Sequence, residues 1–151
     1  MAEYDVELLA RQGPGIIRFG WVANLLFALT AIPVAAGVDD LLGVAITVAL
    51  LLFLVSVGVF VYALLLAFAR SSRGDNVVVA NLFFLQGSAP KSIRYRFLWM
   101  FLVCLAIAAG TAAWEPFGVL VPMLPVGLAG MWAARYGVFF PRPTAQPRGR
   151  V

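Results

Sequence analysis

The sequence predicts an all-α membrane protein, a four-transmembrane-helix antiparallel bundle with an interfacial segment between helices 2 and 3. Two observations predict this fold class. Of the 151 residues, 63% are hydrophobic and 12% are charged, whereas soluble domains are about 25% charged. Four apolar stretches also have the length that a helix needs to cross a hydrocarbon core about 30 Å thick. A membrane is the solvent that suits this composition.

Four uninterrupted apolar stretches form the predicted spans. At a rise of 1.5 Å per residue the first is about 30 Å long and the second about 43 Å, so the second tilts or projects beyond the hydrocarbon core. The last two are close to the lower limit for spanning. Spans one and two, and spans three and four, are joined by links of two residues, which enforce antiparallel hairpins. The spans cover residues 19–38, 41–69, 97–114 and 117–134.

Basic residues fall on one side of this topology. The two hairpin links carry only Asp39, Asp40 and Glu115, whereas Lys and Arg precede span one, fill the connection between spans two and three, and follow span four. The positive-inside rule therefore places both termini and the central connection in the cytoplasm. We expect a multi-pass protein of a bacterial plasma membrane. Its basic residues are Arg11, Arg18, Arg70, Arg73, Lys91, Arg94, Arg96, Arg135, Arg142, Arg148 and Arg150.

One membrane domain is expected over residues 1–134, followed by a cytoplasmic tail over residues 135–151. The tail has three prolines after Phe140 and no apolar periodicity. This composition is typical of an extended or disordered segment.

The central connection contains an apolar stretch that is too short to cross a bilayer, within an interfacial loop predicted over residues 76–90. Burying such side chains is worth roughly 1.5–3 kcal/mol each, so the loop should lie in the interface or against protein. Three interpretations are open: an elbow under the chain's own spans with its basic flanks on anionic headgroups, a surface that docks a partner, and a re-entrant segment. The predicted contacts with lipid or a partner are Leu82, Phe83, Phe84, Leu85, Lys91, Arg94 and Arg96.

Several functional classes are excluded by what the chain lacks. The predicted spans contain no ionisable Asp, Glu, Lys, Arg or His, the residues that mark proton relays and ion-coupled carriers. His, the usual axial ligand of membrane haems, is absent from the whole chain. The single cysteine, Cys104, allows no disulfide within one chain. We expect no cofactor, no resident metal, no enzymatic activity and no nucleic-acid partner. Asn24, in span one, is expected to hydrogen-bond a neighbouring helix.

Small residues at four-residue spacing allow helices to approach closely, either within the bundle or at a dimer or partner seam. In span four, Pro122 and Pro125 each remove a backbone donor, so we expect a kink there. That kink would shape a packing groove or, in a sharper hypothesis, a slot for a lipid or quinone tail. The predicted packing residues are Ala106, Gly110, Gly127, Gly130 and Ala134.

The hairpin carboxylates raise one catalytic alternative. If Asp39, Asp40 and Glu115 converged at the outer face, they would offer ligands for a divalent cation or a base for water. No nucleophile–base pair and no phosphate-binding glycine loop supports that chemistry. We therefore favour a topological role, with Asp39 or Asp40 as the N-cap of the second span.

Three stretches of the second half carry a resemblance: LFFLQGSAP at 82–90, PFGVLVPMLPVGLAGMW at 116–132 and ARYGVFFPR at 134–142. In these stretches the chain resembles a group of small uncharacterised integral membrane proteins from actinobacteria. The resemblance does not extend to residues 1–75, and Phe139 and Phe140 stand where that group has a more polar pair. It implies a location in the cell envelope and no particular activity.

Two functions are expected from these patterns. The first is a non-catalytic accessory or structural subunit of a larger plasma-membrane complex, such as a lipid-transport or respiratory assembly, with membrane lipids and larger subunits as its partners. The alternative is a small binding or carrier protein for a lipid or another hydrophobic molecule, using the kink at Pro122 and Pro125. The first predicts a compact isolated bundle, and the second predicts an apolar cavity that opens laterally to lipid.

Overall fold

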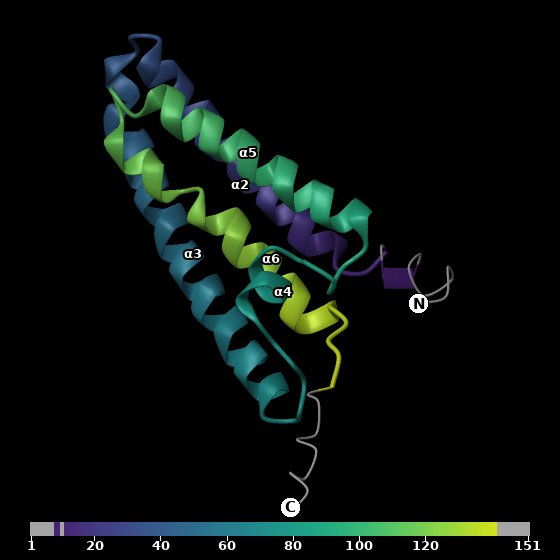
Figure 1. Cartoon of the computed structure of the whole chain (residues 1–151). Coiled ribbons are helices and arrows are strands. Elements are labelled where there is room, and N and C mark those ends of the chain that lie inside the picture. The colour runs from purple at the N-terminus through teal and green to yellow at the C-terminus, as the bar shows by residue number, and fades with distance from the viewer. Residues whose placement is uncertain (1–7, 10, 142–151) are drawn as a thin grey trace, which may run out of the picture.

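The protein is an all-α membrane bundle, shown by a computed structural model that describes residues 8–9 and 11–141 (Figure 1). The described part contains no β-strand and has four segments long and apolar enough to cross a membrane, which confirms the predicted fold class. The elements are α2 (Pro14–Ala35), the 3-10 helix η1 (Asp39–Leu41), α3 (Leu42–Ser71), α4 (Val79–Phe83), α5 (Lys91–Thr111), the 3-10 helix η2 (Pro116–Leu120) and α6 (Met123–Tyr136).

Helix α2 begins five residues before the predicted span because its first turn has favourable chemistry. Gly13 adopts the left-handed conformation with φ 66°, and Pro14 follows in the first helical position, where its missing N–H costs nothing. The helix ends in a Schellman motif at Gly37, which has φ 94°. There the Val38 N–H donates to the Pro33 carbonyl and the Gly37 N–H to the Val34 carbonyl.

The second span is preceded by a 3-10 turn rather than by a side-chain cap. Asp39 and Asp40 lie in η1 and are exposed, and no side chain caps η1 or α3. The predicted N-cap is therefore wrong, because the turn places both carboxylates before Leu41, the residue that precedes α3. Helix α3 has 30 residues, about 45 Å, and exceeds the hydrocarbon thickness.

Helix α5 begins six residues before the predicted span, directly after Pro90. The Ile93 and Arg94 N–H groups both donate to the Pro90 carbonyl, so the chain is helical from the first residue after the proline. The basic segment that was expected in the loop consequently forms the first two turns of a spanning helix.

The fourth span is divided, and its prolines do not act as predicted. After η2 the chain turns at Val121 and Pro122, and α6 starts at Met123. Pro125 occupies the third helical position, where no intrahelical donor is needed. Neither proline interrupts a helix from within, so the predicted kink is replaced by a break between two helices.

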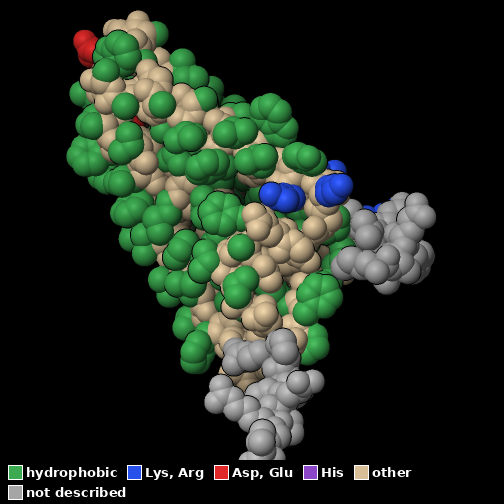
Figure 2. Space-filling view, viewed as in Figure 1, with side chains coloured by type: hydrophobic (Ala, Val, Ile, Leu, Met, Phe, Trp, Pro, Cys, Tyr) green, Lys and Arg blue, Asp and Glu red, His purple; other side chains and the backbone are tan. Residues whose placement is uncertain are grey.

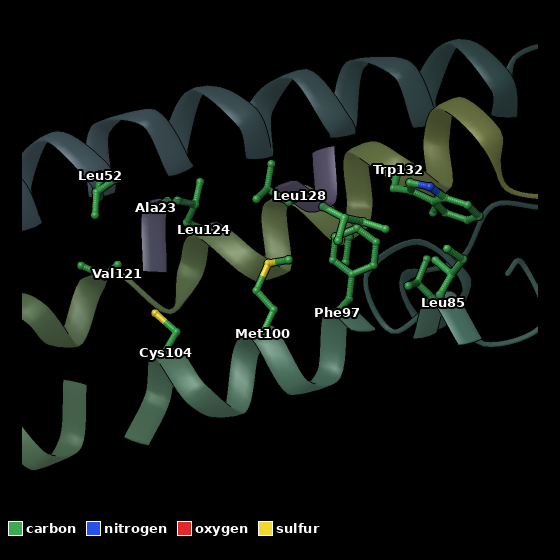
Figure 3. Packing of buried hydrophobic residues seen from close by; sticks show 14 of the residues in the cluster. Ala23, Leu52, Leu85, Phe97, Met100, Cys104, Val121, Leu124, Leu128 and Trp132 are labelled. Carbon is green, nitrogen blue, oxygen red and sulfur yellow. The ribbon is translucent and has the colours of Figure 1, made fainter. Parts of the chain in front are cut away.

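Helix α6 is the centre of the bundle. It packs against α2, α3, α4 and α5, and 67% of its span is buried, compared with 22–33% for the other three spans. In Figure 1, α2 and α5 run side by side, and α6 lies between that pair and α3. Figure 3 shows Met100 and Cys104 of α5 pointing toward α6, with Leu128 facing Met100. Trp132 is fully buried and donates to the Gln12 carbonyl.

The predicted packing residues divide into two groups. Gly127, Gly130 and Ala134 lie in contacts of α6: a Cβ on Gly127 would meet α3 at Val59, Phe60 and Ser56, one on Gly130 would lie 2.6 Å from the Phe83 ring, and Ala134 is buried. Ala106 and Gly110 are exposed on α5, where they line an open apolar depression together with Ile32 and Ala35 of α2. A Cβ on Gly110 would meet no atom of another element of the described chain within 4 Å.

The ends of the bundle differ in charge. Arg18, Arg70, Lys91 and Arg135 lie at one end, which we call the basic end, and the two hairpins with Asp39, Asp40 and Glu115 lie at the other, which we call the acidic end. Figure 2 shows basic side chains grouped near the start of α5 and a carboxylate at the opposite end.

The folded unit extends beyond the predicted domain limit at residue 134. Residues 137–141 run along the basic end, where the Asn76 N–H donates to the Phe140 carbonyl and the Val138 N–H to the Ser88 carbonyl. Arg70 holds this segment by donating to the Gly137 carbonyl over 2.9 Å and by stacking on the Phe139 ring. The tail prediction for residues 142–151 lies outside the described residues.

Candidate functional site: a lateral apolar groove

The strongest candidate site is a groove between α5, α6 and residues 79–88, which contain α4 and which we call the α4 segment. Its volume is about 190 Å³, it is partly open, and its lining includes exposed side chains of α5 such as Leu98. We call it the lateral groove. It is lined by Phe83, Phe84, Leu85, Gln86, Arg94, Phe97, Leu98, Phe101, Pro125, Val126 and Ala129.

The α4 segment forms one wall because its apolar side chains divide between core and surface. Leu82 and Leu85 are buried in the core of the chain. Phe83 stacks on Phe60 of α3, with ring centroids 4.6 Å apart, and its ring lies over Gly130. Phe84 alone among these four predicted contact residues is largely exposed, at 61%. Leu82 is thus packed within the chain, whereas Leu85 is buried and also lines the groove.

The backbone of this wall is strained at the groove. Leu85 has φ 56°, a left-handed conformation that costs an L-residue roughly 1–2 kcal/mol. Its side chain is 2% exposed, so burial in the core holds the residue in this conformation. The Ser88 hydroxyl donates to the Asn81 carbonyl and closes the turn. Strain of this kind recurs at ligand-binding clamps.

Helix α5 supplies the opposite wall and its polar edge. Leu98 and Phe101 follow Arg94 by four and seven residues, so the three side chains lie along one face of the helix. On this face the cation of Arg94 lies near the basic end, and the apolar side chains of Leu98 and Phe101 lie toward the middle of the bundle. Gln86 and Arg94 are the polar side chains of the groove, and both are exposed.

The volume indicates what kind of ligand the groove accepts. Pockets that enclose a whole small molecule measure roughly 300–1,000 Å³, whereas an apolar cavity of about 150 Å³ accepts benzene. At about 190 Å³ the lateral groove has room for part of a ligand only, such as a segment of an acyl chain. The remainder of such a ligand would lie in the bilayer.

Several predicted contact residues lie outside the groove. Lys91 and Arg96 are exposed on α5 and do not line it, and Pro122 lies at the helix break. Six residues that line the groove were not predicted from the sequence: Gln86, Phe97, Leu98, Phe101, Val126 and Ala129. Gln86 precedes α5, and the other five residues lie on α5 and α6, where their spacing of one or three residues places them on adjacent helix faces. In uniformly apolar spans, however, residues that line a groove and residues that face lipid are equally hydrophobic, so the spacing does not distinguish them.

A second unusual feature is the buried carboxyl group of Glu115 at the acidic end. Its side chain is fully buried, and neither carboxyl oxygen has a hydrogen-bond partner of acceptable geometry within the described part. Burial raises the pKa of Glu115, and the backbone N–H groups of Gly118 and Phe117 oppose this rise. A Cβ on Gly118 would lie 2.5 Å from the carboxyl, so the η2 turn closes tightly over it.

The hairpin carboxylates do not assemble into a metal site. Asp39 and Asp40 are exposed in η1, whereas Glu115 points into the bundle. Across residues 8–9 and 11–141, no group of three His, Cys, Asp or Glu side chains is placed to hold a metal ion. The convergence considered from the sequence therefore does not occur, because one of the three residues belongs to the core.

Asn24 has the role expected from the sequence. It is buried in α2, and its amide nitrogen donates to the Met100 carbonyl of α5 over 2.9 Å. This bond ties the two helices together in the middle of the bundle.

Comparison of the chain with protein-family models, with curated proteins and with solved structures found no match.

Proposed function

We propose that this multi-pass membrane protein binds a lipid, or another hydrophobic molecule with an acyl-like chain, in the lateral groove. The observation that carries the proposal is the groove itself, a partly open apolar cavity lined by residues of the spanning helices α5 and α6. An apolar cavity is what the lipid-binding alternative predicts, and we take its presence as support for that alternative. We further propose that the membrane is a bacterial plasma membrane and that the basic end faces the cytoplasm, in agreement with the positive-inside rule.

The position of the groove suits the inner part of a bilayer leaflet. Helix α5 has 21 residues, about 31 Å. Leu98 and Phe101 lie about 10–15 Å along it from Lys91, which is within the half nearer the basic end. A lipid whose headgroup stands at that end would therefore place the first part of its chain beside these side chains.

Filling the groove is expected to abolish lipid retention. Leu98→Trp adds an indole to a groove residue that is 45% exposed, so it should occupy the chain-binding space without disturbing the core. Full-length protein would be purified in a mild detergent, and its copurifying lipid would be counted by native mass spectrometry. We expect retained lipid to fall at least several-fold.

The matched control is Leu102→Trp. Leu102 lies one turn further along α5, is 40% exposed and does not line the groove. It should retain lipid like the unmodified protein. Equal retention in both variants, or none in the unmodified protein, would contradict the proposed function.

A second candidate function, an accessory subunit of a larger membrane complex, is favoured by exposed apolar side chains at the basic end. Phe68, Val79, Phe84 and Phe140 are 61–77% exposed there, at the end of α3, in the α4 segment and in the 137–141 segment. Apolar groups at the margin of the membrane are suited to docking on a subunit of a lipid-transport or respiratory assembly.

This candidate predicts a stoichiometric partner whose retention depends on Phe84. Phe84→Ala should release the partner during purification from native membranes without lowering the melting temperature, because the side chain is largely exposed. Leu54→Ala, on an equally exposed part of α3, should leave the partner bound. Purification of the chain without any stoichiometric partner would exclude the accessory role.

A further inference from the structure

We propose that the lateral groove selects lipids with an anionic headgroup and that Arg94 is the residue that recognises the headgroup phosphate. This inference rests on the proposed function of the groove, to which it adds the chemical class of the ligand. Three features of the site favour an anionic ligand: the order of side chains along one face of α5, the lack of an acidic partner for Arg94 in the described part of the chain, and the positive polarity of the helix terminus.

The first observation is the order of side chains on α5. Lys91 and Arg94 are three residues apart on the exposed surface of the first turns, and Leu98 follows Arg94 by one turn. Cations therefore precede an apolar channel along a single face. An amphiphile with a negative headgroup and an apolar chain is complementary to this order, because its headgroup would lie beside the cations and its chain beside the apolar side chains. Figure 2 shows the basic side chains beside an apolar surface at this end of α5.

The second observation is that Arg94 has no counter-charge among residues 8–9 and 11–141. Asp39, Asp40 and Glu115 lie at the acidic end, and Asp75 forms its ion pair with Arg70 over 2.9 Å. No ion pair or side-chain hydrogen bond involves Arg94 within that part of the chain. Its guanidinium is thus available to a ligand at the edge of the groove, where a phosphate would accept two parallel hydrogen bonds.

The third observation concerns the start of α5. No side chain caps this terminus, and its first turn contains no acidic residue. The positive end of the helix dipole therefore coincides with Lys91 and Arg94, an arrangement that repels cations and favours an anion. A zwitterionic lipid also offers a phosphate to Arg94, but its cationic headgroup nitrogen is repelled by Lys91, Arg94 and the helix terminus, so the charge of the site favours an anionic lipid.

The test compares two lipids that differ only in the headgroup. Purified full-length protein would be equilibrated with equal amounts of phosphatidylglycerol and phosphatidylcholine that carry identical acyl chains, and retained lipid would be measured by native mass spectrometry. Both lipids offer a phosphate to Arg94, but only phosphatidylcholine brings a cationic nitrogen close to Lys91 and Arg94, so we expect phosphatidylglycerol to be preferred at least about five-fold. Arg94→Gln should reduce this preference, because it removes the cation that lines the groove.

The matched control is Arg96→Gln. Arg96 is exposed on the same two turns but does not line the groove, so it reports the effect of general surface charge. It should keep the preference. Melting temperatures of both variants should equal that of the unmodified protein, because both side chains are exposed.

Each other outcome has a definite meaning. An unchanged preference in Arg94→Gln, an equal loss in Arg96→Gln, or displacement of the lipid by millimolar inorganic phosphate would overturn the inference. Retention of both lipids without preference, but dependent on Leu98, would overturn the headgroup selection and leave the proposed function intact. If the unmodified protein retained neither lipid, the proposed function itself would fail.

Discussion

Replacing Arg70 with alanine is expected to lower the free energy of unfolding by about 2–4 kcal/mol. The guanidinium pairs with Asp75 over 2.9 Å, donates to the Gly137 and Ala134 carbonyls over 2.9 and 3.3 Å, and lies 4.6 Å from the centroid of the Phe139 ring. Hydrogen bonds from charged groups contribute about 1.5–3 kcal/mol and a cation–π contact about 0.5–1 kcal/mol, reduced here because the side chain is 27% exposed.

The physical reason for this large effect is that Arg70 joins three separate segments. It connects the end of α3, the loop at Asp75 and the chain that leaves α6. Without it, two carbonyl groups and a carboxylate lose their donor together, and Phe139 loses its cover. Arg70→Lys retains the charge but not the fork of donors, so we expect it to cost roughly half as much.

Unfolding followed by circular dichroism in detergent micelles would measure this effect. Arg73→Ala is the matched control, because Arg73 lies in the same loop and is exposed. Surface substitutions of this type change stability by about 0.5 kcal/mol or less. Equal stability of the Arg70→Ala and Arg73→Ala variants would show that the contacts at the basic end do not hold the fold.

The second large effect is expected at Glu115, where stability should depend on pH. Its pKa is higher in the folded protein than in the unfolded chain, because the folded state buries the carboxyl group. Between the two pKa values the folded state binds more protons, so the free energy of unfolding decreases with rising pH. Stability is greatest below the ordinary pKa of glutamate and falls as the pH passes through the raised value.

Glu115→Gln should remove this pH dependence. Below the ordinary pKa the variant and the unmodified protein should unfold alike, since both side chains are neutral. Above the raised pKa the variant should be more stable by on the order of 1 kcal/mol, because glutamine stays neutral whereas the carboxyl group must either bind a proton or be buried as an anion. Melting temperatures in detergent between pH 4 and pH 8 would measure the difference.

Asp40→Asn provides the control for charge at the same end of the bundle. Asp40 is exposed in η1, so this variant should follow the pH profile of the unmodified protein. A Glu115→Gln variant that is less stable than the unmodified protein at pH 8 would show that the ionised carboxylate is stabilised in the fold.

Some single-residue predictions from the sequence agree with the structure and others do not. The number of spans, the short hairpins and the interhelical role of Asn24 agree with the structure. The helix limits shift by several residues, because Pro14 and Pro90 allow helices to begin before the apolar stretches do. The buried position of Glu115 was not foreseen, since a charged residue in a two-residue link is ordinarily exposed to water.

The candidate site could be predicted only in part. Phe83, Phe84, Leu85, Arg94 and Pro125 were singled out from the sequence and line the groove. Their assembly into one wall depends on the turn at Leu85 and on the break after η2, neither of which leaves a periodic pattern. The expected packing pair Ala106 and Gly110 faces outward, because the spacing of small residues does not specify which side of a helix meets a neighbour.

Hydropathy and charge alone were sufficient to establish a membrane protein with four spans, because crossing a bilayer is a local property of about 20 consecutive residues. The central position of α6, the lateral groove and the burial of Glu115 came from the packing of the helices. In a soluble helix the apolar face marks the core, but in a membrane the lipid-facing side is just as apolar. The faces that meet are selected by close packing between distant residues, such as Gly130 against Phe83, and no local pattern contains that information.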